Sequence, residues 1–417
     1  MRELGMSLPG LRQRAKAIGQ LPALGLLTLA GMTPPPWTCS YEEAPDDTLV
    51  DRLARRRPEL VALSALTASV EEAYRLAHGL RRAGLRVVLG GLHATACPEE
   101  ASRHVDAVIA GEGEPVWRQV LDDALAGSLR PLYRATAPYE LAVSPVPRFD
   151  LLRGPRPRVT LQTQRGCPLN CEFCGASRLL GTFREKPIES IRRELHALAM
   201  RAPEPLLELA DDNTFAGSRD VEPLFEALAV TGARYFTEAD WRIGERADVL
   251  SGLAASGCVQ VLVGLESQVY RLAGMGPKQA EWSRVRDAIQ RIQEAGVAVA
   301  GCFIVGCDGE DRGSLERLKA RILESPLADV QLTLQTPFPG TALYRRLKAQ
   351  GRLLPGRGWS HYTLFDVTYE PLPMSVEELE TGFLDLVRET FSPSAAARRT
   401  EIRKEAWRRN PRPAWAP

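Results

Sequence analysis

The most restrictive feature of this 417-residue chain is an alternation of apolar and helix-like segments between Val159 and about Gln350. Each of six apolar runs precedes a helix-like segment, and these runs read VTLQT, LLELA, RYFTE, VQVLVGLE, VAGCFIVG and VQLTLQ. Strands that alternate with helices predict a parallel sheet. Six such units match a partial version of the eight-stranded barrel, in which chemistry takes place at the carboxyl ends of the strands.

A second alternating series occupies the chain from Trp37 to about Leu132. Its strand-like runs are WTCSYE, LVALSAL, LRVVLGG and VDAVIAG, and helical patterns such as VEEAYRLAHGLRRAG separate them. This pattern predicts a doubly wound, Rossmann-like parallel sheet.

Ligands of doubly wound sheets bind beyond the carboxyl ends of the strands. The candidate binding residues at these ends are Ser64, Thr67, Gly90, Gly91, His93, Gly111 and Glu112. Glycines there allow a bulky ligand to approach the backbone closely. The same glycines are also compatible with simple tight turns between strand and helix.

Composition shifts predict the boundaries of the domains. We expect a first domain over 1–135, a proline-rich linker over 136–158, the barrel over 159–352 and a carboxyl-terminal extension over 353–417. The extension contains the aromatic stretch WSHYTLFDVTYEP, which either lines a substrate entrance or, as we favour, packs the last helix against the barrel. A capping box from Ser375 to Glu378 opens that helix, and the basic tail from Ser394 is expected to be a solvated end.

The overall charge excludes some classes of partner. The chain carries 53 basic and 52 acidic side chains, so we expect no nucleic acid or other polyanionic partner. The apolar segment from Leu21 to Met32 is too short to span a bilayer and is predicted to be a buried helix. Without a signal-peptide cleavage site, and with eight scattered cysteines, the chain is expected to stay in the reducing cytoplasm.

Three of the cysteines crowd into the segment RGCPLNCEFCGAS. Cys167, Cys171 and Cys174 have the spacing C-x3-C-x2-C directly after the first strand of the barrel series. Thiolates are the usual ligands of iron-sulfur clusters, and three of them would leave one iron of a 4Fe-4S cube open. There are two weaker alternatives. One is a zinc site, which needs a fourth protein ligand, and the other is a disulfide with a spare thiol.

Carboxylates follow three successive strands of the same series. Asp211, with Asp212 and Asn213, ends the second strand, Glu238 ends the third and Glu266 ends the fourth. Such acceptors suit an ammonium group and a ribose diol, although acidic residues are also common at exposed strand ends.

The cysteine motif followed by six strand-helix units resembles the radical S-adenosylmethionine superfamily. This resemblance implies that the open iron chelates S-adenosylmethionine and that the reduced cluster cleaves it to methionine and a 5'-deoxyadenosyl radical. It also implies an external electron donor of the flavodoxin or ferredoxin type. Phe173, between two of the cysteines, resembles the aromatic residue that relatives place near the adenine. Phe303 on the fifth strand either packs on the adenine as well or belongs to the core.

The first domain is similar to the cobalamin-binding branch of that superfamily. The similarity lies in VVLGGLHATACPEEA and DAVIAGEGEPVW, and continues in LADDNTF, GLES and QTPFPGTALY. Members of the branch commonly methylate unactivated carbon or phosphorus centres with methylcobalamin, and others catalyse cyclisation or ring contraction. The chain departs from the branch in its first 20 residues, which are polar and basic, so that ELGMSL either forms a poor first strand or the strand is missing. It has no D-x-H-x-x-G, so His93 is not expected to bind cobalt.

The leading hypothesis is therefore a cobalamin-dependent radical methyltransferase that acts on a small molecule. The alternatives are a radical cyclase or isomerase, a cobalamin-free radical enzyme, and a non-catalytic iron-sulfur redox sensor. The remaining cysteines are expected to be buried thiols rather than ligands of an auxiliary cluster, although Cys302 or Cys307 could face the substrate.

Overall fold

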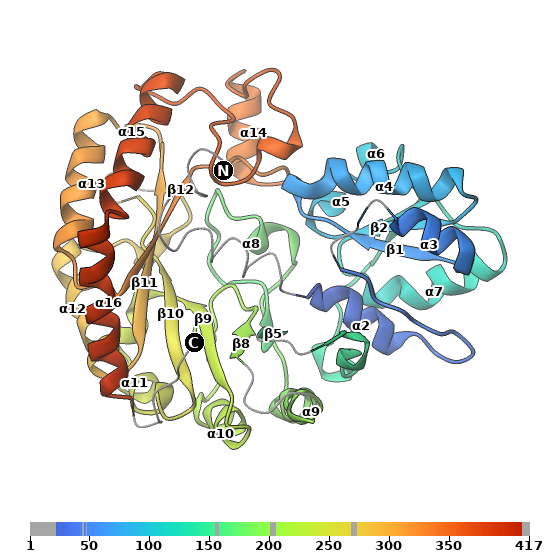
Figure 1. The fold of residues 1–417 in the computed structure, drawn as a ribbon, viewed down its shortest axis with the longest axis horizontal. Helices are drawn as coiled ribbons and strands as arrows, with labels where there is room; N and C mark the ends of the chain where they lie inside the picture. The colour runs from blue at the N-terminus through green and yellow to red at the C-terminus, as the bar shows by residue number, and fades with distance from the viewer. Residues whose placement is uncertain are drawn as a thin grey trace.

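The computed structural model describes residues 22–43, 46, 48–154, 158–200, 206–267 and 273–410. Two parallel sheets organise this part of the chain, and they lie side by side in Figure 1, with the first sheet drawn in blue and cyan. Within the described residues, no helix is long and apolar enough to cross a membrane. Residues 1–20 lie outside the described residues. Whether ELGMSL forms a poor first strand or the strand is missing therefore stays a prediction.

The first sheet has four parallel strands in sequential order. They are β1 (Val61–Ser64), β2 (Val87–Gly90), β3 (Ala107–Ala110) and β4 (Leu132–Arg134). Helices α3 (Leu49–Arg56) and α4 (Val70–Arg82) contribute to the core on one face, whereas α2 (Leu24–Met32) and α7 (Glu114–Leu125) contribute to the core on the other. Burial on both faces explains why the strands read as continuous apolar runs, and the doubly wound prediction is confirmed.

The predicted strand WTCSYE is wrong. Residues 37–43 have no regular structure, and several of them are only half-buried. The backbone groups of a strand need hydrogen-bond partners on a neighbouring strand. Among the described residues, the first sheet ends at β1, and no strand pairs with this segment. The buried helix predicted just before it is present as α2, in which Leu27 is fully buried.

The second sheet confirms the six strands of the partial barrel. They are β5 (Arg158–Leu161), β8 (Leu206–Leu209), β9 (Arg234–Ala239), β10 (Cys258–Gly264), β11 (Ala298–Val305) and β12 (Asp329–Leu334). All neighbours are parallel and the order is β12-β11-β10-β9-β8-β5. The outer helices are α9 (Ile188–Ala199), α10 (Glu222–Val230), α11 (Ala247–Leu253), α12 (Trp282–Glu294) and α13 (Arg312–Glu324) (Figure 1).

Burial alternates along the central strands and distinguishes the two faces of the second sheet. Tyr235, Val261 and Phe303 belong to the core that the strands share with the outer helices. Their neighbours in sequence are half-buried or exposed. Because successive side chains of a strand point to opposite faces, these neighbours line the inner, concave face of the partial barrel.

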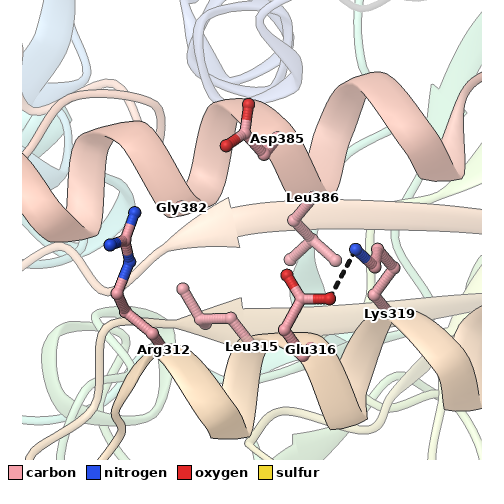
Figure 2. A pocket seen from close by; sticks show the side chains of 7 residues that line it. All are labelled: Arg312, Leu315, Glu316, Lys319, Gly382, Asp385 and Leu386. Carbon is pink, nitrogen blue, oxygen red and sulfur yellow. Dashed lines mark ion pairs between the residues drawn. The ribbon is translucent and has the colours of Figure 1, made fainter.

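The carboxyl-terminal helices α15 (Val376–Thr390) and α16 (Pro393–Arg408) pack against the barrel. The predicted capping box is confirmed, since Ser375 and Glu378 exchange both hydrogen bonds. In Figure 2, Leu315 of α13 and Leu386 of α15 lie between α13 and α15, beside the ion pair of Lys319 with Glu316. Gly382 permits this approach, because a Cβ there would lie 2.6 Å from a methyl carbon of Leu315.

The prediction of a solvated tail is wrong for residues 394–410. Ala406 is buried, the indole of Trp407 donates to the carbonyl of Val259 at 2.8 Å, and Asn410 donates to the carbonyl of Gly296 at 3.2 Å. These contacts close the amino-terminal ends of the central strands, which a solvated tail would leave open. Residues 411–417 of the predicted tail lie outside the described residues.

Candidate active site

The three clustered cysteines lie in a loop that the short hairpin β6 (Gln164–Arg165) and β7 (Arg184–Glu185) brackets. Cys171 is buried, whereas Cys167 and Cys174 are half-buried. The loop packs on Ile304 at the carboxyl end of β11. This places the thiols over the end of the barrel where chemistry was predicted.

The three sulfur atoms interact electrostatically with one another but do not converge as ligands of a single ion would. Cys174 contributes to the raised pKa of Cys167, and Cys174 and Cys167 contribute to that of Cys171, yet among the described residues the three Sγ atoms do not form a group within 4.8 Å of one another. A 4Fe-4S cube spreads its thiolates over separate irons. The arrangement therefore fits a cluster better than a single zinc ion.

Burial raises the pKa of Cys167 and raises that of Cys171 to about 12, whereas nearby Lys278 opposes the shift at Cys171. These thiols hold their protons until a metal displaces them.

Lys278 is a member of the site that the sequence analysis missed. Its ammonium lies 2.6 Å from Glu266, and its carbonyl accepts a hydrogen bond from the indole of Trp241. Gly264 leaves room for it, because a Cβ there would lie 2.3 Å from Nζ. Glu266, predicted to bind a ligand, is thus already paired within the protein. The only sequence signal for Lys278 is a lone lysine in a Gly-Pro turn.

Asp211 and Asn213 hold the cysteine hairpin in place rather than facing an open site. Asp211 is buried and accepts hydrogen bonds from the amides of Thr163 (2.8 Å) and Gln164 (3.1 Å). The carbonyl of Asn213 accepts from the side chain of Gln164 at 2.5 Å, and its side-chain oxygen accepts from the amide of Asp240. Of the predicted ligands on this strand, only Asp212 retains an open carboxylate.

Asp212 and Glu238 form an acidic pair at the mouth of the barrel. Glu238 keeps contact with solvent inside the concave face, although protein atoms surround it on most sides. Burial, followed by the neighbouring carboxylates, raises the pKa of Asp212 to about 6 and that of Glu238 to about 7. A cationic ligand would stabilise the ionised form of both groups.

The inner face also presents residues that sequence reasoning did not single out. Strand register places Glu208 beside Phe236, Phe236 beside Gln260, and Glu238 beside Leu262. Cys302 lies on the same face and is half-buried, whereas Cys307 is fully buried and accepts a hydrogen bond from Gln335. Cys302 is therefore the one of the two that faces the concavity.

The two predicted aromatic residues have different positions. Phe173 is half-buried between the cysteine loop and the apolar residues of α14 (Ala342–Ala349). Phe303 is fully buried in the core between sheet and helices. Of the two alternatives for Phe303, the structure supports the core residue, because its strand position points it away from the concave face.

At the edge of the first sheet, the predicted residues separate into an open ledge and a buried layer. Ser64 and Gly111 are exposed, and Gly90 and Gly91 are half-buried. We call these four residues the glycine ledge. Gly111 has φ +89°, and a Cβ there would meet no atom within 4 Å, so the backbone leaves space for a ligand. Thr67 and His93 lie beneath this ledge, fully or almost fully buried.

Glu112 is an ion-pair partner rather than an open ligand. Arg165 contacts Glu112 at 2.5 Å and Glu114 at 2.7 Å, and Arg184 contacts Glu112 at 2.9 Å. Burial acts to raise the pKa of Glu112, but hydrogen bonds from Arg184, the amide of Tyr139 and Arg165 together hold that pKa below its usual value. We call Arg165, Arg184, Glu112 and Glu114 the domain clamp, because it joins the first sheet to the cysteine hairpin.

The donors present fit the cofactors that the sequence resemblance implies. Three thiols at the strand end suit a cluster, two open carboxylates suit an ammonium and hydroxyls, and the glycine ledge suits a flat, bulky ligand. Arg346 of α14 supports the loop further by donating to Glu172 at 3.0 Å.

Family models match three successive parts of the chain. Family models match for the B12 binding domain at residues 14–121, for the radical SAM superfamily at residues 161–322 and for a domain of unknown function (DUF4070) at residues 341–416. The first two together cover well over half of the chain.

Two of the similar proteins are named as methyltransferases. A bacteriochlorophyllide d C-12(1)-methyltransferase of Chlorobaculum tepidum is 26% identical over 359 residues, which is 84% of this chain and 78% of the relative. The radical S-adenosylmethionine methyltransferase TsrM of Kitasatospora setae, solved with cobalamin and a [4Fe-4S] cluster, has a TM-score of 0.64 at 16% identity, covering 85% of this chain and 82% of TsrM.

The cobalamin-dependent radical enzyme OxsB, solved with aqua-cobalamin and S-adenosylmethionine, also has a TM-score of 0.64. The identity is 15%, and the match covers 81% of this chain and 60% of OxsB. On the agreement of family models and fold, the chain belongs to the cobalamin-binding branch of the radical S-adenosylmethionine superfamily.

Proposed function

We propose that this protein is a cobalamin-dependent radical S-adenosylmethionine methyltransferase that acts on an unactivated carbon of a small molecule. The observation that carries the proposal is the domain clamp, through which Arg165, next to the cysteine motif, reaches Glu112 beside the glycine ledge. Radical generation and methyl transfer would need these two sites in one assembly. The relatives named as methyltransferases support the same reaction.

Each group of residues has a role in this proposal. Cys167, Cys171 and Cys174 would hold the cluster, and the ledge around Gly91 and Gly111 would receive cobalamin. When bound, the cluster supplies the radical from S-adenosylmethionine and cobalamin supplies the methyl group. The carboxylates of Asp212 and Glu238 would accept hydrogen bonds from the ammonium and hydroxyl groups of S-adenosylmethionine.

The inner face would position the substrate near the radical. Phe236 and Leu262 offer apolar contacts there, and Gln260 offers a hydrogen-bonding amide. The electrons would come from an external flavodoxin-type or ferredoxin-type donor. A reducing compartment such as the cytoplasm suits the three thiols that would hold the cluster.

The proposal is tested with anaerobically reconstituted protein. We expect about four irons and four sulfides per chain, retention of added hydroxocobalamin, and formation of 5'-deoxyadenosine with dithionite. With reduced cobalamin, we expect S-adenosylmethionine to be converted to S-adenosylhomocysteine and methylcobalamin. Failure to retain cobalamin would favour a cobalamin-free radical enzyme, and absence of 5'-deoxyadenosine would leave only a redox sensor.

Binding of S-adenosylmethionine is expected to weaken as the pH falls through about 7, the pKa of Glu238. Only the ionised carboxylate attracts the ammonium, so affinity is full when Glu238 is deprotonated and falls at most about tenfold for each pH unit below its pKa. Equilibrium dialysis at a series of pH values measures this slope. Glu238→Gln should flatten it, whereas the control Glu226→Gln, an exposed carboxylate on α10, should leave it unchanged. A slope around pH 7 that persists in Glu238→Gln would exclude Glu238 as its origin, because Asp212 titrates about one unit lower.

A further inference from the structure

A second group of potential metal ligands lies in the first domain, on α5 (Leu92–Ala96), α6 (Pro98–Ala101) and the residue between them. His93 lies in α5, Cys97 directly follows that helix, and Glu100 lies in α6. One ligand atom from each of the three side chains lies within 4.8 Å of the other two. We propose that His93, Cys97 and Glu100 bind a single zinc ion.

The imidazole of His93 supplies the first argument. The side chain is fully buried, and its Nδ1 lies 3.3 Å from the hydroxyl of Thr67. Its Nε2 is buried and has no hydrogen-bond partner, although it lies 3.4 Å from Oε1 of Glu100. A neutral imidazole that donates from Nδ1 has a lone pair on Nε2. In that tautomer the Nε2 lone pair faces Oε1 of Glu100 at 3.4 Å, and a cation between the two atoms would remove their repulsion.

Two further side chains hold the carboxylate of Glu100 in position. Its Oε1 accepts hydrogen bonds from the hydroxyl of Tyr74 at 3.2 Å and from the indole of Trp359 at 2.8 Å. Ligating histidines and carboxylates commonly have such outer partners, which fix their orientation. Thr67, Tyr74 and Trp359 would be the outer partners of this site.

The spacing and the donor types fit zinc. Bonds of 2.0–2.3 Å at tetrahedral angles separate ligand atoms by about 3.3–3.8 Å, and the 3.4 Å between His93 and Glu100 falls in this range. Nitrogen, sulfur and carboxylate oxygen are the three donors that zinc takes in proteins. Glu100 remains one-third exposed, which leaves a path for the ion and for a water as fourth ligand.

The site lies where the segment after the barrel contacts the first domain. The ring of Trp359 packs edge-on against His93, with centroids 4.9 Å apart, and its indole donates to Glu100. An ion held by His93 and Glu100 would fix the surface on which Trp359 packs. The proposed ion is therefore structural.

The test uses tag-free, cluster-reconstituted protein equilibrated with buffered Zn²⁺ and analysed for metals. We expect about one zinc per chain in addition to the iron. Cys97→Ser should lose that zinc while its iron and sulfide stay unchanged. Cys39→Ser, a half-buried cysteine elsewhere in the first domain, is the matched control and should retain the zinc.

A second variant separates ligation from folding. Trp359→Phe keeps an aromatic ring but removes the donor to Glu100, so competition with a chromophoric chelator should show zinc affinity about 10–100-fold weaker. Wild-type protein that takes up no zinc would overturn the proposal. Equal zinc in Cys97→Ser and wild type would also overturn it, because the ion would then lie elsewhere.

Discussion

Replacing Cys174 with alanine is expected to abolish formation of 5'-deoxyadenosine. The proposed cube takes only three protein ligands, so losing one leaves two thiols for four irons, and iron should fall from about four per chain to nearly none. Anaerobic reconstitution, iron and sulfide analysis, and chromatography of the dithionite-driven reaction measure both effects. Because Cys174 is only half-buried, the smaller alanine side chain creates little cavity and the fold should persist.

The matched control is Cys39→Ala, which removes a half-buried thiol outside the cysteine loop. It should keep full iron content and activity. If Cys174→Ala retained a full cluster, a ligand outside this loop would have to replace the thiolate, and the three-cysteine site would be wrong.

Replacing Arg165 with alanine is expected to destabilise the protein by about 3 kcal/mol or more. Arg165, Glu112 and Glu114 expose only 13%, 11% and 8% of their side chains. Removing the arginine leaves Glu114 without its partner in a buried position, and the desolvation of that charge is no longer offset. Chemical unfolding of the cluster-free protein measures the loss.

The control for the domain clamp is Arg118→Ala on α7. Arg118 pairs with Asp122, but their side chains are 71% and 57% exposed, so the expected loss is below about 0.5 kcal/mol. Adding Glu114→Gln to Arg165→Ala should restore part of the stability, because the unpaired charge is then removed. If the double variant were as unstable as the sum of the two single variants, the buried ion pair would not be the cause.

The strands and the cysteine loop were predictable because their signals are local. The six barrel runs needed only their apolar character and their alternation with helix-like segments. Cys167, Cys171 and Cys174 needed only their spacing. The capping box at Ser375 is equally local, since its two residues are three positions apart.

The errors arose where distant segments decide the environment of a residue. Nothing near WTCSYE shows that the sheet ends at β1, and nothing in the tail shows that Trp407 reaches Val259, 148 residues away. Phe303 and Glu112 were chosen for residue type and strand-end position. The structure turns Phe303 toward the helices and gives Glu112 two arginine partners from the cysteine hairpin.

The sequence by itself determined the two alternating series, the proposed ligand set for a cluster and the family resemblance, because each depends on residues close together in the chain. Only the tertiary structure decided which carboxylates stay open. Burial and long-range hydrogen bonds bind Asp211, Glu112 and Glu266 to protein partners and leave Asp212 and Glu238 facing the mouth. The structure also brought Trp359 to Glu100 across 259 residues, a contact that no local pattern encodes.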